Sequence, residues 1–154
     1  MQVVSHPLLL EFRECIQSPT HIYIVTELVR GRDLFDYVKQ RGRLPAVEAA
    51  RIVQQVIVGI RFLHSFDIVH RDLKPENIMV VPDEDGHVSA IKVIDFGFSN
   101  YLSKIEEAGE GENLVGTPNY MAPEVLLQQP FDFKIDNFAI GVILFFTYPR
   151  SKIG

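Results

Sequence analysis

The chain has 154 residues, a net charge of −5 and a single cysteine. Its length fits one ordinary domain, and its acidic balance argues against a nucleic acid or an anionic membrane as the main partner. Because Cys15 has no second cysteine to pair with, we expect an intracellular, cytoplasmic setting in which thiols stay reduced. The most apolar run, Phe138 to Tyr148, is too short to span a membrane and predicts a buried helix instead.

The first part of the chain predicts two strands followed by two helices. Residues 8–16 and 22–29 are rich in β-branched and aromatic side chains and flank a turn-forming run at 18–20, which indicates a hairpin. Asp33 is suited to cap a short helix that runs to about residue 40, and Gly42 is suited to end it. A longer helix is expected from Pro45 to Phe66, where apolar residues recur at helical spacing.

The second part of the chain mixes short strands with helices. Residues 77–81 and 89–94 predict two strands around a turn at 82–86. The polar and acidic stretch 100–113 predicts a mobile loop. Residues 124–127 predict a short helix, and residues 135–146 predict the apolar helix that contains the run noted above.

Three short motifs follow the long predicted helix in a fixed order. They are His70-Arg71-Asp72-Leu73-Lys74-Pro75-Glu76-Asn77, then Asp95-Phe96-Gly97, then Ala122-Pro123-Glu124. In this order they match the catalytic loop, the metal-binding turn and the end of the activation segment of protein kinases. A polar turn without chemistry is the alternative for any one of them, but all three together favour phosphoryl transfer.

The residue types in these motifs suit that reaction. Phosphoryl transfer needs metal ions held against the phosphates and a group that orients the attacking hydroxyl. The carboxylate of Asp72 can accept the hydroxyl proton, and Lys74 can place a positive charge beside the transferred group. Asn77 and Asp95 offer oxygen ligands of the kind that Mg²⁺ prefers.

On these motifs the chain resembles the catalytic domain of eukaryotic serine/threonine protein kinases, most of all the calcium/calmodulin-dependent group. Lys74 and the segment 116–124 favour Ser/Thr over Tyr acceptors. The resemblance covers about residues 6–146 and implies an α+β, protein-kinase-like fold with ATP and Mg²⁺ as cofactors and Ser/Thr-containing proteins as substrates. It divides the chain into a small-lobe hairpin and hinge (1–29), a helical large-lobe core (30–146) and a divergent tail (147–154).

The resemblance also implies a nucleotide site. Residues 25–29 match the strand and hinge that hold adenine, although an ordinary edge strand is the alternative. The match makes Thr26 the gatekeeper and assigns the backbones of Glu27 and Val29 to the base. Met79 would lie beneath the adenine ring, and Asp33 would lie near the ribose.

Further positions acquire structural roles by the same match. Thr117 would hydrogen-bond the Asp72 carboxylate, and Asp136 would hold the backbone at His70 and Arg71. His70, Phe96 and Asp136 would belong to an internal stack, with Phe12 as a further layer, and Gly97 would complete the metal-binding turn. Glu124 normally pairs with an Arg that lies beyond this chain.

Two hypotheses concern substrates and regulation. Glu76 and Asp33 resemble acids with which basophilic kinases bind Arg or Lys before the acceptor, and two solvated acids are an equal alternative. Arg71 marks kinases that are switched on by activation-loop phosphorylation. Asn113 occupies the position of the usual phosphate acceptor, which suggests that an acidic residue replaces phosphate or that no switch exists, and a solvated acidic loop is an equal alternative. The acidic candidates are Glu106, Glu107, Glu110 and Glu112, with Ser99 and Ser103 as minor phosphorylation sites.

Some expected kinase parts have no match in this sequence. It contains no Gly-rich loop and no strand Lys of the Val-Ala-Ile-Lys type ahead of the motifs. Residues 88–92 imitate that strand, but Lys92 stands three positions before Asp95 and would lie in the other lobe. We therefore expect a kinase domain truncated at both ends, and the alternative function is an inactive interaction module.

Overall fold

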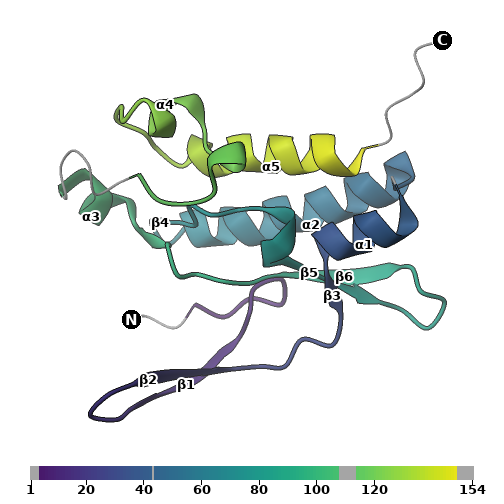
Figure 1. The fold of residues 1–154 in the computed structure, drawn as a ribbon, viewed down its shortest axis with the longest axis horizontal. Coiled ribbons are helices and arrows are strands. Elements are labelled where there is room, and N and C mark those ends of the chain that lie inside the picture. The colour runs from purple at the N-terminus through teal and green to yellow at the C-terminus, as the bar shows by residue number, and fades with distance from the viewer. Residues whose placement is uncertain (1–3, 43, 108–113, 149–154) are drawn as a thin grey trace.

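The computed structural model describes residues 4–42, 44–107 and 114–148, and these form a mixed α+β structure (Figure 1). The elements in chain order are β1 (Phe12–Gln17), β2 (Ile22–Thr26), β3 (Arg32–Asp33), α1 (Leu34–Arg41), α2 (Ala46–His64), β4 (Ile68–Val69), the 3-10 turn η1 (Pro75–Asn77), β5 (Ile78–Pro82), β6 (Val88–Val93), β7 (Asn100–Tyr101), α3 (Leu102–Glu107), the 3-10 turn η2 (Pro118–Tyr120), α4 (Pro123–Leu126) and α5 (Lys134–Thr147). None of the described helices is long and apolar enough to cross a membrane.

The core is organised around α2, which lies between α5 and the three-stranded sheet β3-β5-β6 (Figure 1). The buried residues of α2 recur every three or four positions, so one broad apolar stripe of the helix faces the core and meets both layers. Ile52, Val56 and Ile60 are fully enclosed, and they pack in one cluster with Ile91 of β6 and Ile143 of α5. This burial of aliphatic side chains supplies most of the stabilisation of the fold.

Helix α1 begins and ends as its sequence predicts. The carboxylate of Asp33 accepts a hydrogen bond from the backbone N–H of Asp36 at 2.8 Å, which satisfies one of the free donors of the first turn. Gly42 follows the last turn with φ of 73°, a conformation that costs glycine little. The helix therefore starts directly after β3 and lies beside η1.

The hairpin β1–β2 stands apart from this core. Its two strands are antiparallel and pair with each other, whereas the described core strands form separate sheets. Figure 1 shows the hairpin projecting beyond the sheet β3-β5-β6. All of the residues in β2 are exposed, including Ile22 and Ile24, so the hairpin contributes little to the core.

Several predicted boundaries were wrong. Strand β1 begins at Phe12 rather than residue 8, because Leu8 to Leu10 instead join the edge of β6 through backbone hydrogen bonds with Val93. Strand β2 ends at Thr26, and residues 27–29 continue as an irregular connection. The apolar run from Phe138 is buried along one side of α5, while Phe138, Phe145 and Tyr148 are exposed.

The stretch 100–107 is ordered structure rather than the predicted loop. Residues 100–101 form β7 and pair with β4, and α3 follows directly. The reason is that Ile105 is buried in a small second cluster with Val69, Val125 and Ile135. The remaining residues of the predicted loop, 108–113, and the predicted tail from 149 onward lie outside the described residues.

Candidate active site

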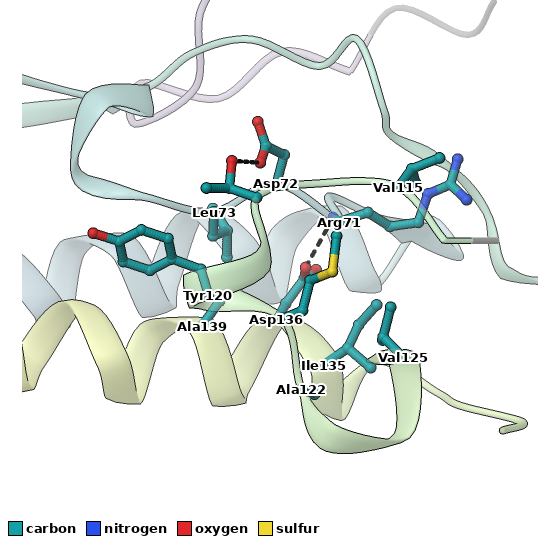
Figure 2. Close-up of a pocket in the computed structure, with 12 residues that line it drawn as sticks. Arg71, Asp72, Leu73, Val115, Tyr120, Ala122, Val125, Ile135, Asp136 and Ala139 are labelled. Carbon is teal, nitrogen blue, oxygen red and sulfur yellow. Dashed lines mark hydrogen bonds between the residues drawn. The ribbon is translucent and has the colours of Figure 1, made fainter. Parts of the chain in front are cut away.

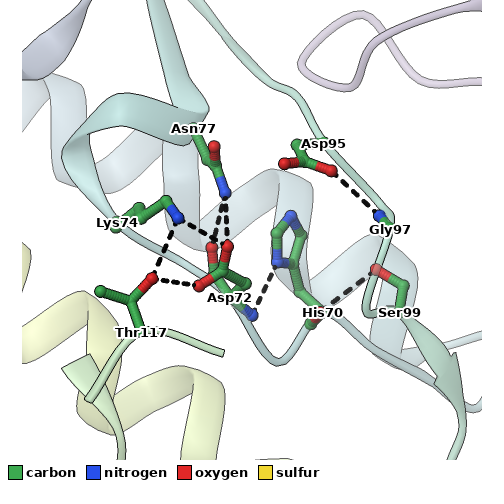
Figure 3. Close-up of polar contacts among 8 residues, drawn as sticks. All are labelled: His70, Asp72, Lys74, Asn77, Asp95, Gly97, Ser99 and Thr117. Carbon is green, nitrogen blue, oxygen red and sulfur yellow. Dashed lines mark hydrogen bonds and ion pairs between the residues drawn. The ribbon is translucent and has the colours of Figure 1, made fainter. Parts of the chain in front are cut away.

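The predicted catalytic loop places Asp72 at the centre of a cluster of hydrogen bonds (Figure 3). Its Oδ1 accepts from the Thr117 hydroxyl at 2.7 Å, and its Oδ2 lies 2.8 Å from Lys74 Nζ. Lys74 Nζ also donates to Thr117 Oγ1 at 2.9 Å, so the three side chains form a closed triangle. The expected hydrogen bond from Thr117 to Asp72 is therefore present, between residues far apart in sequence.

Asn77 is oriented by the same carboxylate. Its Nδ2 donates to Asp72 Oδ2 at 3.1 Å and to the Asp72 carbonyl oxygen at 2.9 Å. Both amide hydrogens are thereby used, and the amide oxygen faces away from Asp72 (Figure 3). A buried Asn held in this way presents a neutral oxygen ligand.

Asp95 lies beside Asn77 because β5 and β6 are neighbours. The Ile94 N–H donates to the Asn77 carbonyl oxygen at 2.9 Å, which fixes the backbone immediately before Asp95. Asp95 is exposed with φ of 61°, and its Oδ1 accepts from the Gly97 N–H at 3.1 Å. A Cβ at position 97 would lie 3.1 Å from that same oxygen, so glycine leaves the turn uncrowded.

The donor set suits a partly protein-bound Mg²⁺. Within the described residues, no group of three or more His, Cys, Asp or Glu side chains is arranged to hold a metal alone. Mg²⁺ in phosphoryl-transfer sites takes one or two protein oxygens and fills its shell with phosphates and water. Asn77 and Asp95 fit that requirement because each has an oxygen free of the Asp72 cluster.

The backbone beneath the site is held in an unusual conformation. Arg71 has φ of 69°, in the left-handed region that costs a non-glycine residue about 1–2 kcal/mol. Asp136 of α5 accepts from the His70 N–H at 2.9 Å and the Arg71 N–H at 3.0 Å, as expected. Figure 2 shows the bond to Arg71. His64 Nε2 also lies 2.8 Å from Asp136 Oδ2, an interaction that the sequence did not indicate.

His70 is fully enclosed behind this loop. Its Nδ1 accepts a hydrogen bond from the Asp72 N–H at 3.3 Å, and its ring lies 5.3 Å from that of Phe96. Burial lowers the pKa of His70 below its ordinary value of 6.5 despite the nearby carboxylate of Asp136. The imidazole is therefore held neutral and serves as a packing and accepting group.

Thr117 is brought to Asp72 by a tight backbone approach at Gly116. A Cβ at this position would lie 2.4 Å from the Arg71 carbonyl oxygen, and φ is 114°. Only glycine permits both the contact and the conformation. Arg71 itself points elsewhere, because its Nε donates to the Phe98 carbonyl oxygen at 2.6 Å.

The predicted nucleotide-binding residues are brought together only in part. Asp33 and Met79 are paired neighbours in the sheet, and both are half-buried. Thr26, Glu27 and Val29 lie on the hairpin and its exit, where the Thr26 hydroxyl donates to the Glu27 carbonyl oxygen at 3.2 Å. The Asp33 carboxylate also caps α1, in addition to its predicted place near the ribose.

The two predicted substrate acids and Glu124 lie at the edges of the site. Glu76 is exposed on η1. Burial of Tyr120, together with the negative charge of Glu76, raises the pKa of the Tyr120 hydroxyl. Glu124 is half-buried rather than buried, and its carboxylate forms no ion pair within the described residues. Of the acidic candidates for a phosphate mimic, Glu106 and Glu107 are exposed on α3, and Glu110, Glu112 and Asn113 lie outside the described residues.

Comparison with known proteins agrees with this geometry. The sequence model of the protein kinase domain matches residues 1–152. The chain belongs to the protein kinase family. Its fold is the kinase-like α+β fold that its motifs predicted, and a relative similar along most of this chain is named a serine/threonine-protein kinase.

Named relatives are similar along most of this chain. It is 44% identical over 146 residues to CBL-interacting serine/threonine-protein kinase 9 of Arabidopsis thaliana, covering 94% of this chain and 32% of the relative. It is 43% identical over 141 residues to human calcium/calmodulin-dependent protein kinase type 1B, covering 91% and 39%. It is 39% identical over 143 residues to calcium/calmodulin-dependent protein kinase type 1 of Macrobrachium nipponense, covering 92% and 39%. The chain thus spans less than two-fifths of the length of these relatives.

Proposed function

We propose that this protein transfers the terminal phosphoryl group of ATP to Ser or Thr residues of other proteins. The observation that carries the proposal is the closed cluster of Asp72, Lys74 and Thr117, with Asn77 oriented beside it (Figure 3). Each of these side chains has the chemistry that phosphoryl transfer requires, and all of them meet at one point.

Asp72 is the proposed base because one acceptor position remains on its carboxylate. A carboxylate has about four lone-pair positions, two on each oxygen. Lys74 and Asn77 use both positions on Oδ2, whereas Thr117 uses one on Oδ1. The remaining position on Oδ1 can accept the hydrogen of a substrate hydroxyl and orient its oxygen for attack.

Lys74 and Thr117 lie at the same place, where the phosphoryl group would be transferred. The ammonium of Lys74 is mostly enclosed yet partly solvent-accessible, with 22% of its side chain exposed. It can therefore approach the phosphoryl oxygens as their charge develops. In this partly enclosed site the electrostatic attraction is stronger than it would be in bulk water. Thr117, in the segment 116–124, holds Oδ1 of Asp72 through its hydroxyl and so helps to fix the orientation of the carboxylate.

Mg²⁺ and ATP are the proposed cofactor and co-substrate. Asn77 and Asp95 would hold the metal, which neutralises charge on the phosphates when bound. The adenine would lie between the hinge residues Glu27 and Val29 and the Met79 side chain, with Thr26 as the gatekeeper. A rise in melting temperature with Mg-ATP, reduced in Asp95→Asn, is the expected result.

The proposed substrates are proteins with basic residues near the acceptor. Glu76 is exposed within the predicted catalytic loop, and the capping bond of Asp33 uses only one of its two carboxylate oxygens. A carboxylate gives a guanidinium both attraction and direction. A peptide panel with Ser, Thr or Tyr acceptors, each with Arg or Ala three positions before, tests this: transfer should favour Ser and Thr with Arg. Equal transfer to the Arg and Ala peptides would contradict the basic preference alone.

The second candidate is a non-catalytic interaction module. The observation in its favour is the apolar exposure of the hairpin, where Ile22 and Ile24 are more than two-thirds exposed. Such a module requires neither Mg-ATP binding nor transfer. Unchanged melting with Mg-ATP, in a sample that unfolds cooperatively, would favour it over the kinase.

We further propose an intracellular, cytoplasmic location and a division of the chain at the hinge near residue 29. The single cysteine supports the location, since it gives no disulfide to stabilise an extracellular domain. The separate hairpin supports the division, because its strands form their own sheet.

A further inference from the structure

Lys92 lies on β6 and forms a mostly enclosed ion pair with Glu27. The Lys92 Nζ is 2.5 Å from Glu27 Oε1, and only 20% and 18% of the two side chains are exposed. In the sequence, Lys92 imitates the phosphate-binding Lys of the small-lobe strand. In the structure it lies on β6 of the core sheet, as expected, and it forms its ion pair at the base of the hairpin.

The ion pair joins three segments of the chain. Glu27 Oε1 also accepts from the Glu11 N–H at 2.8 Å, and the Glu27 N–H donates to the Glu11 carbonyl oxygen at 3.0 Å. Lys92 Nζ additionally donates to the Leu9 carbonyl oxygen at 3.4 Å. The segment before β1, the exit of β2 and the core strand β6 therefore meet at one carboxylate.

The electrostatics of Glu27 agree with this arrangement. Burial would raise the pKa of the Glu27 carboxyl, but the hydrogen bond and charge of Lys92 outweigh it, so the pKa lies below 4.5. At neutral pH the Glu27 carboxyl is therefore ionised. Removing one partner would leave a poorly solvated charge on the other.

Strand pairing does not connect the hairpin to the described core. Strands β1 and β2 pair with each other, and no strand of the described core pairs with them. Figure 1 shows that the hairpin extends from its base without lying on the core layers. Contacts at residues 9–11, 27 and 92 are thus the polar connections between the hairpin and the sheet of β6.

We propose that Lys92 and Glu27 are a positioning pair that fixes the hairpin and the hinge segment, residues 27–29, relative to the core. The inference rests on the proposed function, because the hinge backbone at Glu27 and Val29 is where adenine would bind. The pair acts through the backbone of Glu27 and does not touch the nucleotide. If its loss lowers the population of the correct hinge orientation to about one tenth, the apparent nucleotide affinity falls about tenfold.

The first experiment measures the hinge without nucleotide. Cys15 is the only cysteine and is exposed on β1, so a spin label there reports hairpin motion. Lys92→Met and Glu27→Gln should raise the mobility of the label to a similar degree. Lys92→Arg keeps the positive charge and should therefore keep the ordered spectrum of the parent. The matched control Lys39→Met alters an exposed Lys of α1 and should change nothing.

The second experiment measures Mg-ATP affinity of the same variants. Lys92→Met should bind about tenfold more weakly than the parent, with Lys92→Arg and Lys39→Met within about twofold. Unchanged label mobility in Lys92→Met, or raised mobility with unchanged affinity, would overturn the proposal. If the parent binds no Mg-ATP while Lys92→Met still loosens the label, the proposed function is wrong and the structural role of the pair is supported.

Discussion

Asp136 shows how one enclosed side chain can maintain a site that it does not enter. Its carboxylate accepts from two consecutive backbone N–H groups and contacts His64, while the side chain is only 1% exposed. The left-handed backbone at Arg71 persists because these bonds compensate for its strain. The orientation of Asp72, the next residue, depends on this support.

We expect Asp136→Ala to lower the free energy of unfolding by about 3 kcal/mol or more, because it leaves buried donors and His64 without their acceptor. Urea unfolding followed by circular dichroism measures the change. Glu84→Ala, at an exposed loop position, is the control and should change stability by less than about 0.5 kcal/mol. A loss for Asp136→Ala as small as that of the control would show that the loop is held by other contacts.

His70 predicts a pH dependence of stability. Because burial lowers its folded pKa below 6.5, the unfolded chain binds a proton more readily than the folded one. Its contribution is therefore complete above pH 6.5 and is lost as the pH falls below that value, by up to about 1.4 kcal/mol per pH unit. The variant His70→Phe, which removes the titrating ring, should show a shallower decline between pH 7 and 5 in urea unfolding. An identical decline in parent and variant would assign the effect to other groups.

At the scale of elements, local sequence signals predicted the helices better than the strands. The cap at Asp33, the stop at Gly42 and the apolar spacing of α2 are all contained within their own segments, so their boundaries were predicted closely. Strand ends depend on partners elsewhere: residues 8–10 join β6, and residues 27–29 leave the hairpin. Helix α3 was missed because its order comes from burial of Ile105 against distant residues rather than from its acidic composition.

Helix α5 contains a glycine with no packing requirement. Gly141 lies in the middle of α5 on its solvent-exposed side, and a Cβ there would meet nothing within 4 Å. Gly141→Ala should therefore raise the free energy of unfolding by about 0.5–1 kcal/mol, since alanine loses less backbone entropy on folding. Thermal unfolding measures the gain.

Gly59 of α2 is the matched control for Gly141. A Cβ at Gly59 would lie 3.3 Å from a Leu9 methyl carbon and 3.4 Å from Leu8 Cβ. Crowding offsets the entropic benefit at this position, so Gly59→Ala should bring no comparable gain. Equal stabilisation by both substitutions would mean that the contact of α2 with the Leu8–Leu9 segment adapts freely.

At the scale of the whole molecule, the layers α5, α2 and β3-β5-β6 form one core with the site at its edge (Figure 1). Ile143 is fully buried where α5 meets α2. Ile143→Ala should cost about 2–5 kcal/mol through lost contacts and a cavity, and unfolding should remain a single transition. Val47→Ala, on the exposed side of α2, should cost less than about 0.5 kcal/mol. Two separate urea transitions in Ile143→Ala would show that the layers unfold independently.

The composition of the candidate site was predictable, and the resemblance also predicted the support from Asp136, whereas two other supports were not predicted. Asp72, Lys74 and Asn77 stand close together in one motif, so their proximity follows from the sequence. The link to Thr117 followed from the family resemblance alone. The contacts of His64 with Asp136 and of Lys92 with Glu27 join residues 72 and 65 positions apart, and no local pattern marks either pair.

The central claim is that Asp72 orients the acceptor hydroxyl for phosphoryl transfer. The most direct measurement is transfer of labelled phosphate from ATP to an Arg-containing Ser peptide, with the purified protein beside its Asp72→Asn variant and Glu84→Ala as control. Circular dichroism would establish that all three are folded. We predict transfer by the parent and Glu84→Ala and a loss of at least about 100-fold in Asp72→Asn. No transfer by a folded parent, or equal transfer by Asp72→Asn, would contradict the account.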